Sequence, residues 1–384
     1  MVTSSTPAAA LPSPDANADR PVPPVDERPA WVVPCPDLDA GARLFEAAGF
    51  SLLAIGPADD PRWAVMGSGE GRYTTMLRLD ASAHRAGHRH PFLEVDENDP
   101  LLRSAEDDPM SEFVAAGSGP IGLADTATTD PPTPTELGSG AAADWVVGRA
   151  GMRYRDLLPG RWGGQFIASH IHIPEGGPVP DYVHYHHVDF QLIFCHRGWV
   201  RVVYQDQGDP FVLNPGDAIL QAPGLRHRVL EASDDLHVIE VSSPAEHATF
   251  VEHGLDLPNG FDPGRWYGGQ RYVHHRAADV PWATVGTGIR RRSFDLESAT
   301  GGRYAASVIE LEAGEAARVE LPVARSVDFE LVAILDGALA VTDPTSGRQA
   351  TFEAGAALGI DDHVTRTARP EQATRLLTVS RHRT

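Results

Sequence analysis

The chain has 384 residues, of which 42% are hydrophobic and 22% charged, a composition typical of a globular protein with two or three domains. Its 32 basic and 53 acidic residues give a net charge of −21, which argues against nucleic acid or an anionic membrane surface as a partner. All 32 basic residues are arginines, so chemistry that requires a lysine, such as Schiff-base catalysis, is excluded.

The N-terminal residues 1–28 are rich in Pro, Ala and Ser and lack the basic start and apolar centre of a signal peptide. We predict that they form a disordered tail. Apolar runs stay well below the roughly 18 residues of a membrane helix, so no membrane partner is expected. The two cysteines, Cys35 and Cys195, are too few for a disulfide framework. These features together predict a cytoplasmic protein.

Residues 29–98 are predicted to form a small α+β unit. The strand WVVPC opens it, and the segment DLDAGARLFEAAGF follows with apolar residues at helical spacing. Asp37 is the expected N-cap of this helix and Gly49 its C-cap. Three strands with the sequences SLLAIG, RWAVMG and YTTMLRLD come next, so the predicted order is β-α-β-β-β. Residues 99–142, rich in Asp, Pro, Thr, Gly and Ser, are predicted to be a linker.

Two β-rich sections, residues 143–255 and 281–384, are joined by a connector over residues 256–280. The sequence VDFQLIFCHRGWVRV at Val188 matches VDFELVAILDGALAV at Val327. Paired glycines precede both sequences at an equivalent distance, and the offset between the two sections drifts only from 137 to 139 residues. We therefore predict a duplicated β-domain of about 110 residues, built from short strands.

The first section contains a cluster of histidines with the spacing of a metal site. His184 and His186 are alternate residues, which share one face of a strand. His227 follows the turn Pro223-Gly224, which can bring a later strand alongside. Three imidazoles that converge inside a small barrel can bind Zn, Cu, Fe or Ni.

These residues resemble the two sequence motifs of the cupin superfamily. In the first motif, His184-Tyr185-His186 is followed by Gln191 and then Gly198, and in the second, Gly216-Asp217 and Pro223-Gly224 precede His227. The resemblance implies a bicupin, with two double-stranded β-helix barrels in tandem after the small N-terminal unit. It also implies one divalent transition metal, with iron preferred over Zn, Ni or Cu, held by His184, His186, His227 and Gln191.

Gln191 departs from the cupin pattern, because the family usually has a glutamate ligand there. An uncharged ligand set leaves the charge of the metal ion uncompensated, which strengthens its Lewis acidity and favours an anionic ligand. It also weakens the case for manganese and for oxalate decarboxylation. Gln191 lies seven residues after His184, so a bend between them is needed to bring both to one face. Without a bend, His187 shares a face with Gln191 and is the alternative ligand.

The second section has lost most of the expected ligands. Val323, Arg325 and Ser326 align with His184, His186 and His187, while Glu330 aligns with Gln191 and His363 lies near the position of His227. We predict a barrel without metal that packs against the first one. A pocket for an organic ligand in this barrel is the alternative.

Other residues are candidates for substrate chemistry. His170 and His172 share one strand face just before the first motif, and a role in proton transfer is predicted for them. Arg226 could bind a substrate carboxylate, and Tyr182 could line the cavity. The unit at residues 29–98 resembles half of a vicinal oxygen chelate (glyoxalase-like) domain. Its first strand has no metal-binding histidine, so it is predicted to be an accessory module and a candidate for homodimerisation.

These features favour a metal-dependent cupin enzyme that acts on a small oxygenated or aromatic acid. Three histidines without a carboxylate resemble the sites of cupin dioxygenases, so an Fe(II) dioxygenase, an oxidoreductase, is the leading hypothesis. The alternatives are a Zn- or Ni-dependent isomerase, cyclase or lyase, and a non-enzymatic bicupin that binds a small molecule. Consumption of O₂ would separate the first from the second.

Overall fold

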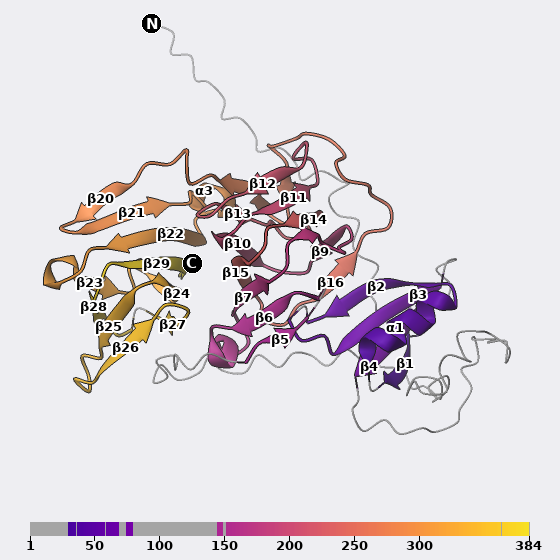
Figure 1. The fold of residues 1–384 in the computed structure, drawn as a ribbon, viewed down its shortest axis with the longest axis horizontal. Helices are drawn as coiled ribbons and strands as arrows, with labels where there is room; N and C mark the ends of the chain where they lie inside the picture. Colours follow the sequence, from indigo (N-terminus) through magenta and orange to yellow (C-terminus); the bar gives the residue numbers. More distant parts are fainter. Residues whose placement is uncertain are drawn as a thin grey trace, which may run out of the picture.

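The computed structural model describes residues 30–35, 37–57, 59–68, 74–79, 144–148, 151–361 and 363–383. The predicted tail at 1–28 and the predicted linker at 99–142 lie outside the described residues. Strands make up most of the described chain, which forms a small N-terminal module and two β-barrels in a row (Figure 1). The predicted mainly β fold is confirmed.

The N-terminal module has the predicted order β-α-β-β-β. Asp37 caps the helix, since its side-chain Oδ1 accepts a hydrogen bond from the backbone N–H of Ala40 at 2.9 Å. Gly49 ends the turn after the helix with a φ of 84°, a left-handed conformation that favours glycine. Phe45 packs edge-on against Phe50 at a ring distance of 5.3 Å. The elements are β1 (Ala30–Cys35), α1 (Leu38–Ala47), β2 (Phe50–Gly56), β3 (Trp63–Ser68) and β4 (Thr74–Leu79).

The sheet of this module continues into the first barrel. Strand β2 pairs antiparallel with β16 (Thr249–Val251), and β16 pairs on its other side with β9 (His184–His186), as Figure 1 shows. Arg161 of the barrel also donates a hydrogen bond to Asp59 of the module at 2.6 Å. The module is therefore attached to the barrel wall that carries two of the predicted metal ligands.

Two sheets face each other in the first barrel. One has the order β16-β9-β14-β11-β12, and the other β19-β13-β10-β15-β7-β6-β5. Apolar side chains of both sheets form a buried cluster in the barrel interior. The remaining strands are β5 (Val146–Val147), β6 (Arg153–Asp156), β7 (Ile167–Ile173), β8 (Gly177–Pro178), β10 (Phe190–Arg197), β11 (Val200–Tyr204), β12 (Phe211–Leu213), β13 (Ala218–Leu220), β14 (His227–Ala232) and β15 (Leu236–Ser243).

The second barrel repeats this strand order, without counterparts of β8, β16 and β19. Its sheets have the orders β20-β21-β22-β29-β24-β27 and β23-β28-β25-β26. The predicted duplication is therefore visible in the strand order as well as in the sequence. The strands are β20 (Ala283–Gly286), β21 (Ile289–Ser293), β22 (Tyr304–Leu311), β23 (Val319–Leu321), β24 (Val327–Asp336), β25 (Ala338–Thr342), β26 (Gln349–Glu353), β27 (Ala357–Ile360), β28 (Arg366–Pro370) and β29 (Thr374–His382).

The segment predicted to be a connector, residues 256–280, contains strands of its own. One of them, β19, pairs with β13 and so extends a sheet of the first barrel. Its strands are β17 (Trp266–Tyr267), β18 (Gln270–Arg271) and β19 (Val273–His275). Short helical turns elsewhere in the chain are η3 (Pro159–Trp162), α3 (Glu297–Thr300) and η4 (Glu315–Ala317).

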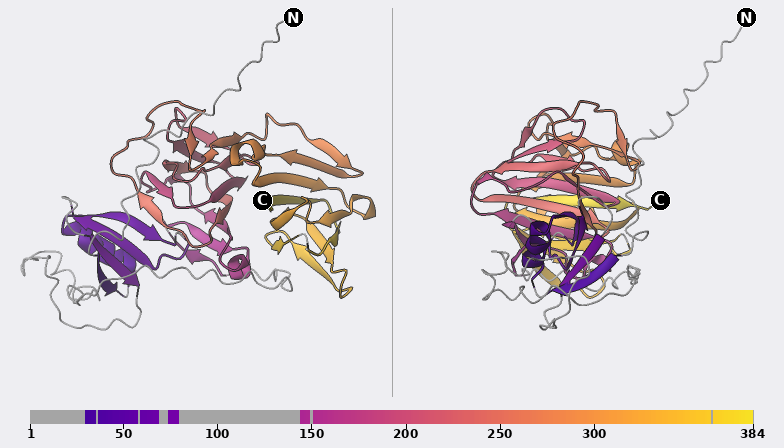
Figure 2. Two further views of the ribbon diagram at one scale, coloured as in Figure 1. Left: turned by 180° about the vertical axis from the view of Figure 1, so that it is seen from behind. Right: turned by 90° about the vertical axis from the view of Figure 1, so that its right-hand side faces the viewer.

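Aromatic residues hold the two barrels together in a repeated contact. Phe166 stacks on Phe329 at a ring distance of 3.9 Å, and Phe190 stacks on Tyr304 at 4.0 Å. In the sequence repeat, Phe166 corresponds to Tyr304 and Phe190 to Phe329. The same contact is thus made twice, once in each direction, as in a two-fold symmetric dimer. The left view in Figure 2 shows the barrels packed side by side.

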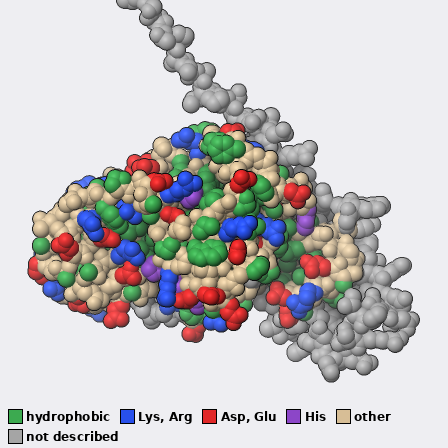
Figure 3. All heavy atoms as spheres, turned by 45° about the horizontal axis from the view of Figure 1, so that its top comes forward, with side chains coloured by type: hydrophobic (Ala, Val, Ile, Leu, Met, Phe, Trp, Pro, Cys, Tyr) green, Lys and Arg blue, Asp and Glu red, His purple; other side chains and the backbone are tan. Residues whose placement is uncertain are grey.

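On the face of the molecule shown in Figure 3, acidic and basic side chains are interspersed over the barrels. None of the helices in the described part of the chain has the length and apolar character needed to cross a bilayer.

Candidate metal centre

Three histidines meet inside the first barrel. His184 and His186 lie on β9, and His227, the first residue of β14, is the register partner of His184. Their exposed fractions are 0%, 6% and 5%, and their candidate ligand atoms all lie within 4.8 Å of one another. The structure therefore brings together the three histidines that the sequence selects.

Hydrogen bonds fix the orientation of each imidazole ring. The Nδ1 atom of His184 lies 2.8 Å from the carbonyl oxygen of Tyr182, and Nδ1 of His227 lies 2.9 Å from that of Leu225. Because carbonyl oxygens only accept, both Nδ1 atoms carry the proton and both Nε2 atoms carry the lone pair. His186 Nδ1 bonds the hydroxyl of Thr249 at 3.0 Å. Such outer contacts orient histidine ligands for a metal ion.

This donor set fits a divalent transition metal. The rings of His184 and His227 are 4.2 Å apart and tilted by 57°, while those of His184 and His186 are 5.1 Å apart and nearly perpendicular. Rings at such angles can direct nitrogen atoms toward one point. The group includes no carboxylate among the described residues, so its ligands are neutral.

Gln191 lies in a buried chain of hydrogen bonds beside the histidines. Its amide Nε2 donates to Glu240 Oε1 at 3.0 Å, and its Oε1 accepts from Gln221 Nε2 at 2.8 Å. Tyr204, which stacks on His227, donates its hydroxyl proton to Gln221. Both ends of the Gln191 amide are thus engaged within the protein, and its role as a ligand stays a prediction.

A bend solves the problem of strand parity between His184 and Gln191. Strand β9 belongs to one sheet and β10 to the other, and residues 187–189 cross between them. Both His184 and Gln191 are buried inside the barrel as a result, while His187 is exposed. The structure therefore does not bring the reserve ligand His187 to the other histidines.

His170 and His172 lie on a different face from the one that was expected. Along β7, Ile171 points into the barrel core, so its neighbours His170 and His172 point outward. Ala168, on the same face as the histidines, belongs to the core between the barrels. The prediction that His170 and His172 line the cavity of the first barrel is corrected on this ground, and with it their part in catalysis there.

These outward residues form a hydrogen-bonded chain of their own. Arg155 donates to Nδ1 of His170, whose Nε2 lies 2.8 Å from Nδ1 of His237. His237 Nε2 and His172 Nε2 each lie 3.0 Å from Asp235 Oδ1. Burial, with Arg155 and His237 nearby, lowers the pKa of His170 to about 3. Part of this chain lines a cavity of about 220 Å³ between the barrels.

His172, Asp235 and His237 lie close enough to be considered as a second metal group. Their geometry argues against it. The rings of His172 and His237 stack at 4.4 Å with an angle of only 8° between their planes, and both Nε2 atoms point at Asp235 Oδ1 at hydrogen-bond distance. Since Arg155 can only donate, the order of donors along the chain places a proton on His237 Nε2. This group is therefore a hydrogen-bonded network.

The two predicted substrate-binding residues have different surroundings. Tyr182 lies at the metal centre, because its backbone carbonyl orients His184 and its ring is 5.8 Å from the ring of His184. The Arg226 guanidinium pairs with Glu252 at 3.1 Å and stacks on Tyr185 at 4.2 Å. Its contact with a substrate stays a prediction.

His247 adds a group that sequence analysis did not select. Its Nδ1 donates to the carbonyl of Pro244 at 3.0 Å, and its ring lies 5.6 Å from that of His186. Its Nε2 atom is buried and accepts no hydrogen bond from the described residues. His247 lies in the loop before β16, outside both motifs, so spacing gave no signal for it.

At the equivalent place, the second barrel has other residues than those that the sequence alignment predicts. Leu321 on β23 and Arg366 on β28 are register partners, as His184 and His227 are in the first barrel. Arg366, and not His363, thus occupies the position of His227, and it lies at the same offset of 139 residues as the matched Gly216 and Gly355. The described residues of this barrel include no group of three His, Cys, Asp or Glu ligands.

Comparison with known proteins places the fold. No model of a protein family matches the chain, and no curated protein matches it. The structure of oxalate decarboxylase from Lactobacillus farciminis, a formate complex, aligns with a TM-score of 0.50 at 15% identity, over 66% of this chain and 88% of that one. The chain has a bicupin fold. Oxalate decarboxylase from Bacillus subtilis aligns with a TM-score of 0.44 at 12% identity, over 76% of this chain and 84% of that one.

Proposed function

We propose that this bicupin is a metal-dependent enzyme that acts on a small organic acid. The observation that carries the proposal is the group of three buried histidines, oriented through their Nδ1 atoms. Burying three imidazoles beside one another costs free energy of desolvation that an apolar core would avoid, so the arrangement has little structural benefit. A metal ion explains the convergence.

His184, His186 and His227 would hold the ion. When bound, a divalent metal supplies Lewis acidity, and iron in addition supplies electrons for chemistry with O₂. Neutral ligands leave its positive charge uncompensated, so an anionic substrate such as a carboxylate completes the site. Imidazole ligands suit iron, zinc and nickel alike, and we propose iron and a dioxygenase because the all-histidine group resembles the sites of cupin dioxygenases, with a zinc- or nickel-dependent lyase or isomerase as the alternative.

Other residues of the chain shape the site around the substrate. The Tyr204–Gln221–Gln191–Glu240 chain fixes the polar groups beside the histidines. His247 Nε2 can accept a hydrogen bond from a hydroxyl or a protonated acid of the substrate, because Pro244 already holds its other nitrogen. The ring of Tyr182 covers one side of His184.

The test is the metal content of the untagged protein, measured by elemental mass spectrometry. We expect about one transition metal ion per chain in wild type and none in the His184→Ala/His227→Ala variant. His187→Ala and His363→Ala serve as matched controls, since neither histidine belongs to the group, and both should keep the metal. Wild type that stays metal-free after reconstitution would overturn the proposal.

The kind of metal then directs the assay for activity. A protein that contains iron should consume O₂ with a small carboxylic acid, and His184→Ala/His227→Ala should not. Zinc or nickel without O₂ consumption would replace the dioxygenase by a lyase or isomerase that uses the same site.

A further inference from the structure

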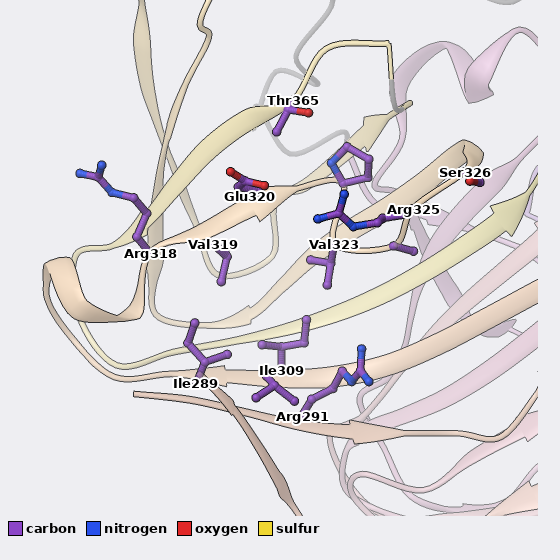
Figure 4. A pocket seen from close by; sticks show the side chains of 13 residues that line it. Ile289, Arg291, Ile309, Arg318, Val319, Glu320, Val323, Arg325, Ser326 and Thr365 are labelled. Carbon is purple, nitrogen blue, oxygen red and sulfur yellow. The ribbon is translucent and has the colours of Figure 1, made fainter. Parts of the chain in front are cut away.

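The second barrel contains an open pocket that the proposed metal chemistry does not use. A cavity of about 570 Å³ adjoins another of about 460 Å³, and the two share Arg291, Val323, Ala324 and Arg325 in their walls. Figure 4 shows the first of them, between strands β21 and β22 on one side and β23 with the loop 322–326 on the other. Each volume is in the range of small-molecule sites.

The walls of this pocket combine apolar and cationic groups. Ile289, Ile309, Val319 and Val323 present aliphatic side chains to it. Arg291 on β21 and Arg325 in the loop line both cavities, and neither makes an ion pair within the described part of the chain. A third arginine in the wall, Arg318, is already paired with Glu315 at 2.6 Å.

The larger of the two cavities has a cationic lining although the chain as a whole is acidic. Three arginines and one glutamate, Glu320, line the larger cavity, whereas the net charge of the chain is −21, and the smaller cavity adds Asp295, Glu297 and Glu330 beyond the two shared arginines. Arg291 and Arg325 are exposed and make no ion pair within the described residues, so both guanidinium groups are available to a ligand beside the apolar wall. An anion from solution is the missing partner that fits them.

Buried Glu330 fixes the loop that carries Arg325. Its carboxylate accepts hydrogen bonds from the backbone N–H groups of Val323 at 2.6 Å and Ala324 at 2.9 Å, and from the Ser380 hydroxyl at 2.8 Å. Glu330 aligns with Gln191 of the first barrel. In the second barrel this position anchors a loop. Because the loop is held in place, Arg325 is positioned before a ligand arrives.

We infer that the second barrel binds an organic oxyanion with an apolar body. Arg291 and Arg325 pair with its carboxylate or phosphate group, and Ile289, Ile309, Val319 and Val323 contact its apolar part. This site is separate from the histidine group, so it does not depend on the metal proposal.

The experiment is isothermal titration calorimetry on the full chain with octanoate, octyl phosphate and octanol as probes. We expect both anions to bind and octanol to bind at least about tenfold more weakly, because it lacks the charge. The tighter of the two anions identifies the head group as a carboxylate or a phosphate. Octanol that binds as well as the anions, or no binding of either anion, would overturn the inference.

Variants locate the site. Arg291→Gln/Arg325→Gln should weaken the binding of the anions by at least about tenfold. Arg290→Gln is the matched control, since Arg290 is the strand neighbour of Arg291, points to the other side and pairs with Glu310. Thermal unfolding confirms that the variants are folded, and unchanged metal content of the first barrel separates this test from the metal proposal. Equal affinity in the double variant and wild type would place any binding elsewhere and refute the assignment.

Discussion

Arg366 of the second barrel occupies the position that His227 occupies in the first. Each is the register partner of the residue on the neighbouring strand, Leu321 in one barrel and His184 in the other. Both residues are buried, with exposed fractions of 4% and 5%. One scaffold thus presents an imidazole in one copy, which can bind a metal, and in the other a guanidinium, which cannot.

The two copies also differ at a second pair of equivalent residues, Gln191 on β10 and Glu330 on β24. Gln191 bonds Gln221 and Glu240 beside the histidines, whereas Glu330 bonds two backbone N–H groups and Ser380. Burial raises the pKa of the Glu330 carboxyl despite these donors. The first copy therefore contains the candidate metal centre, whereas in the second copy the equivalent buried residue fixes a loop beside a pocket.

Thr249 should control the affinity for the metal without touching it. Its hydroxyl bonds His186 Nδ1 at 3.0 Å, so Thr249→Val removes the group that orients this ring. We expect the dissociation constant of the metal to rise by about 10- to 100-fold, as for other outer-shell partners of histidine ligands. Competition with a chromophoric chelator measures it. Thr249→Ser keeps the hydroxyl and should stay near wild type, so equal weakening by both variants would assign the effect to packing.

Gln191→Glu should make the stability of the metal-free protein depend on pH. The new carboxylate would lie within hydrogen-bond distance of Glu240, which raises the pKa of the new carboxyl in the folded state above its unfolded value. Stability is then lost as pH rises through that raised pKa. We expect the variant to lose about 2 kcal/mol of unfolding free energy at pH 7.5 relative to pH 5. Urea denaturation of chelator-treated protein measures it, and Gln191→Met, which is uncharged, should show no such additional slope.

The aromatic contacts between the barrels should contribute strongly to stability. Phe166 and Phe329 are both buried and stack at 3.9 Å. Each single substitution to alanine should cost about 3–5 kcal/mol of unfolding free energy. Because the rings touch, the double variant should cost less than the sum of the two, as calculated from denaturant midpoints. Strict additivity would show that the stacking contact itself contributes little.

The sequence contained enough information to predict the repeat and the three histidines, because both depend on regular spacing. His184 and His186 alternate on one strand, and the matched glycines fix the offset between the copies. The element order of the N-terminal module followed in the same way from helical spacing and from Asp37 as a cap.

Features that depend on the inward or outward direction of a strand were harder to predict. His170 and His172 share a face, but only the packing of Ala168 between the barrels shows that this face points outward. In the second barrel, His363 attracts attention as the nearest histidine, but the residue at the constant repeat offset from His227 is Arg366, an arginine that carries no signal for a metal ligand. His247 approaches His186 through a loop with no periodic pattern.

The histidine chain between the barrels should make the protein sensitive to acid. The pKa of His170 is lowered to about 3 in the folded protein, first by burial and then by Arg155, whereas its ordinary value is 6.5. Between these values the unfolded chain binds a proton at this position and the folded chain does not, so stability falls as pH falls from about 6.5 toward 3. We expect His170 to account for a loss of about 2–3 kcal/mol between pH 7 and pH 4.5.

His170→Gln isolates this contribution, because glutamine has no proton to gain. The variant should be less stable than wild type at pH 7, where it loses the bonds to Arg155 and His237, and should lose less stability on acidification. Denaturant unfolding at pH 7, 5.5 and 4.5 gives the change of unfolding free energy with pH for wild type and for the variant. His187→Gln changes an exposed histidine and should retain the slope of wild type. If His170→Gln also retains that slope, the acid sensitivity arises from other groups, and the neutral state of His170 does not limit stability.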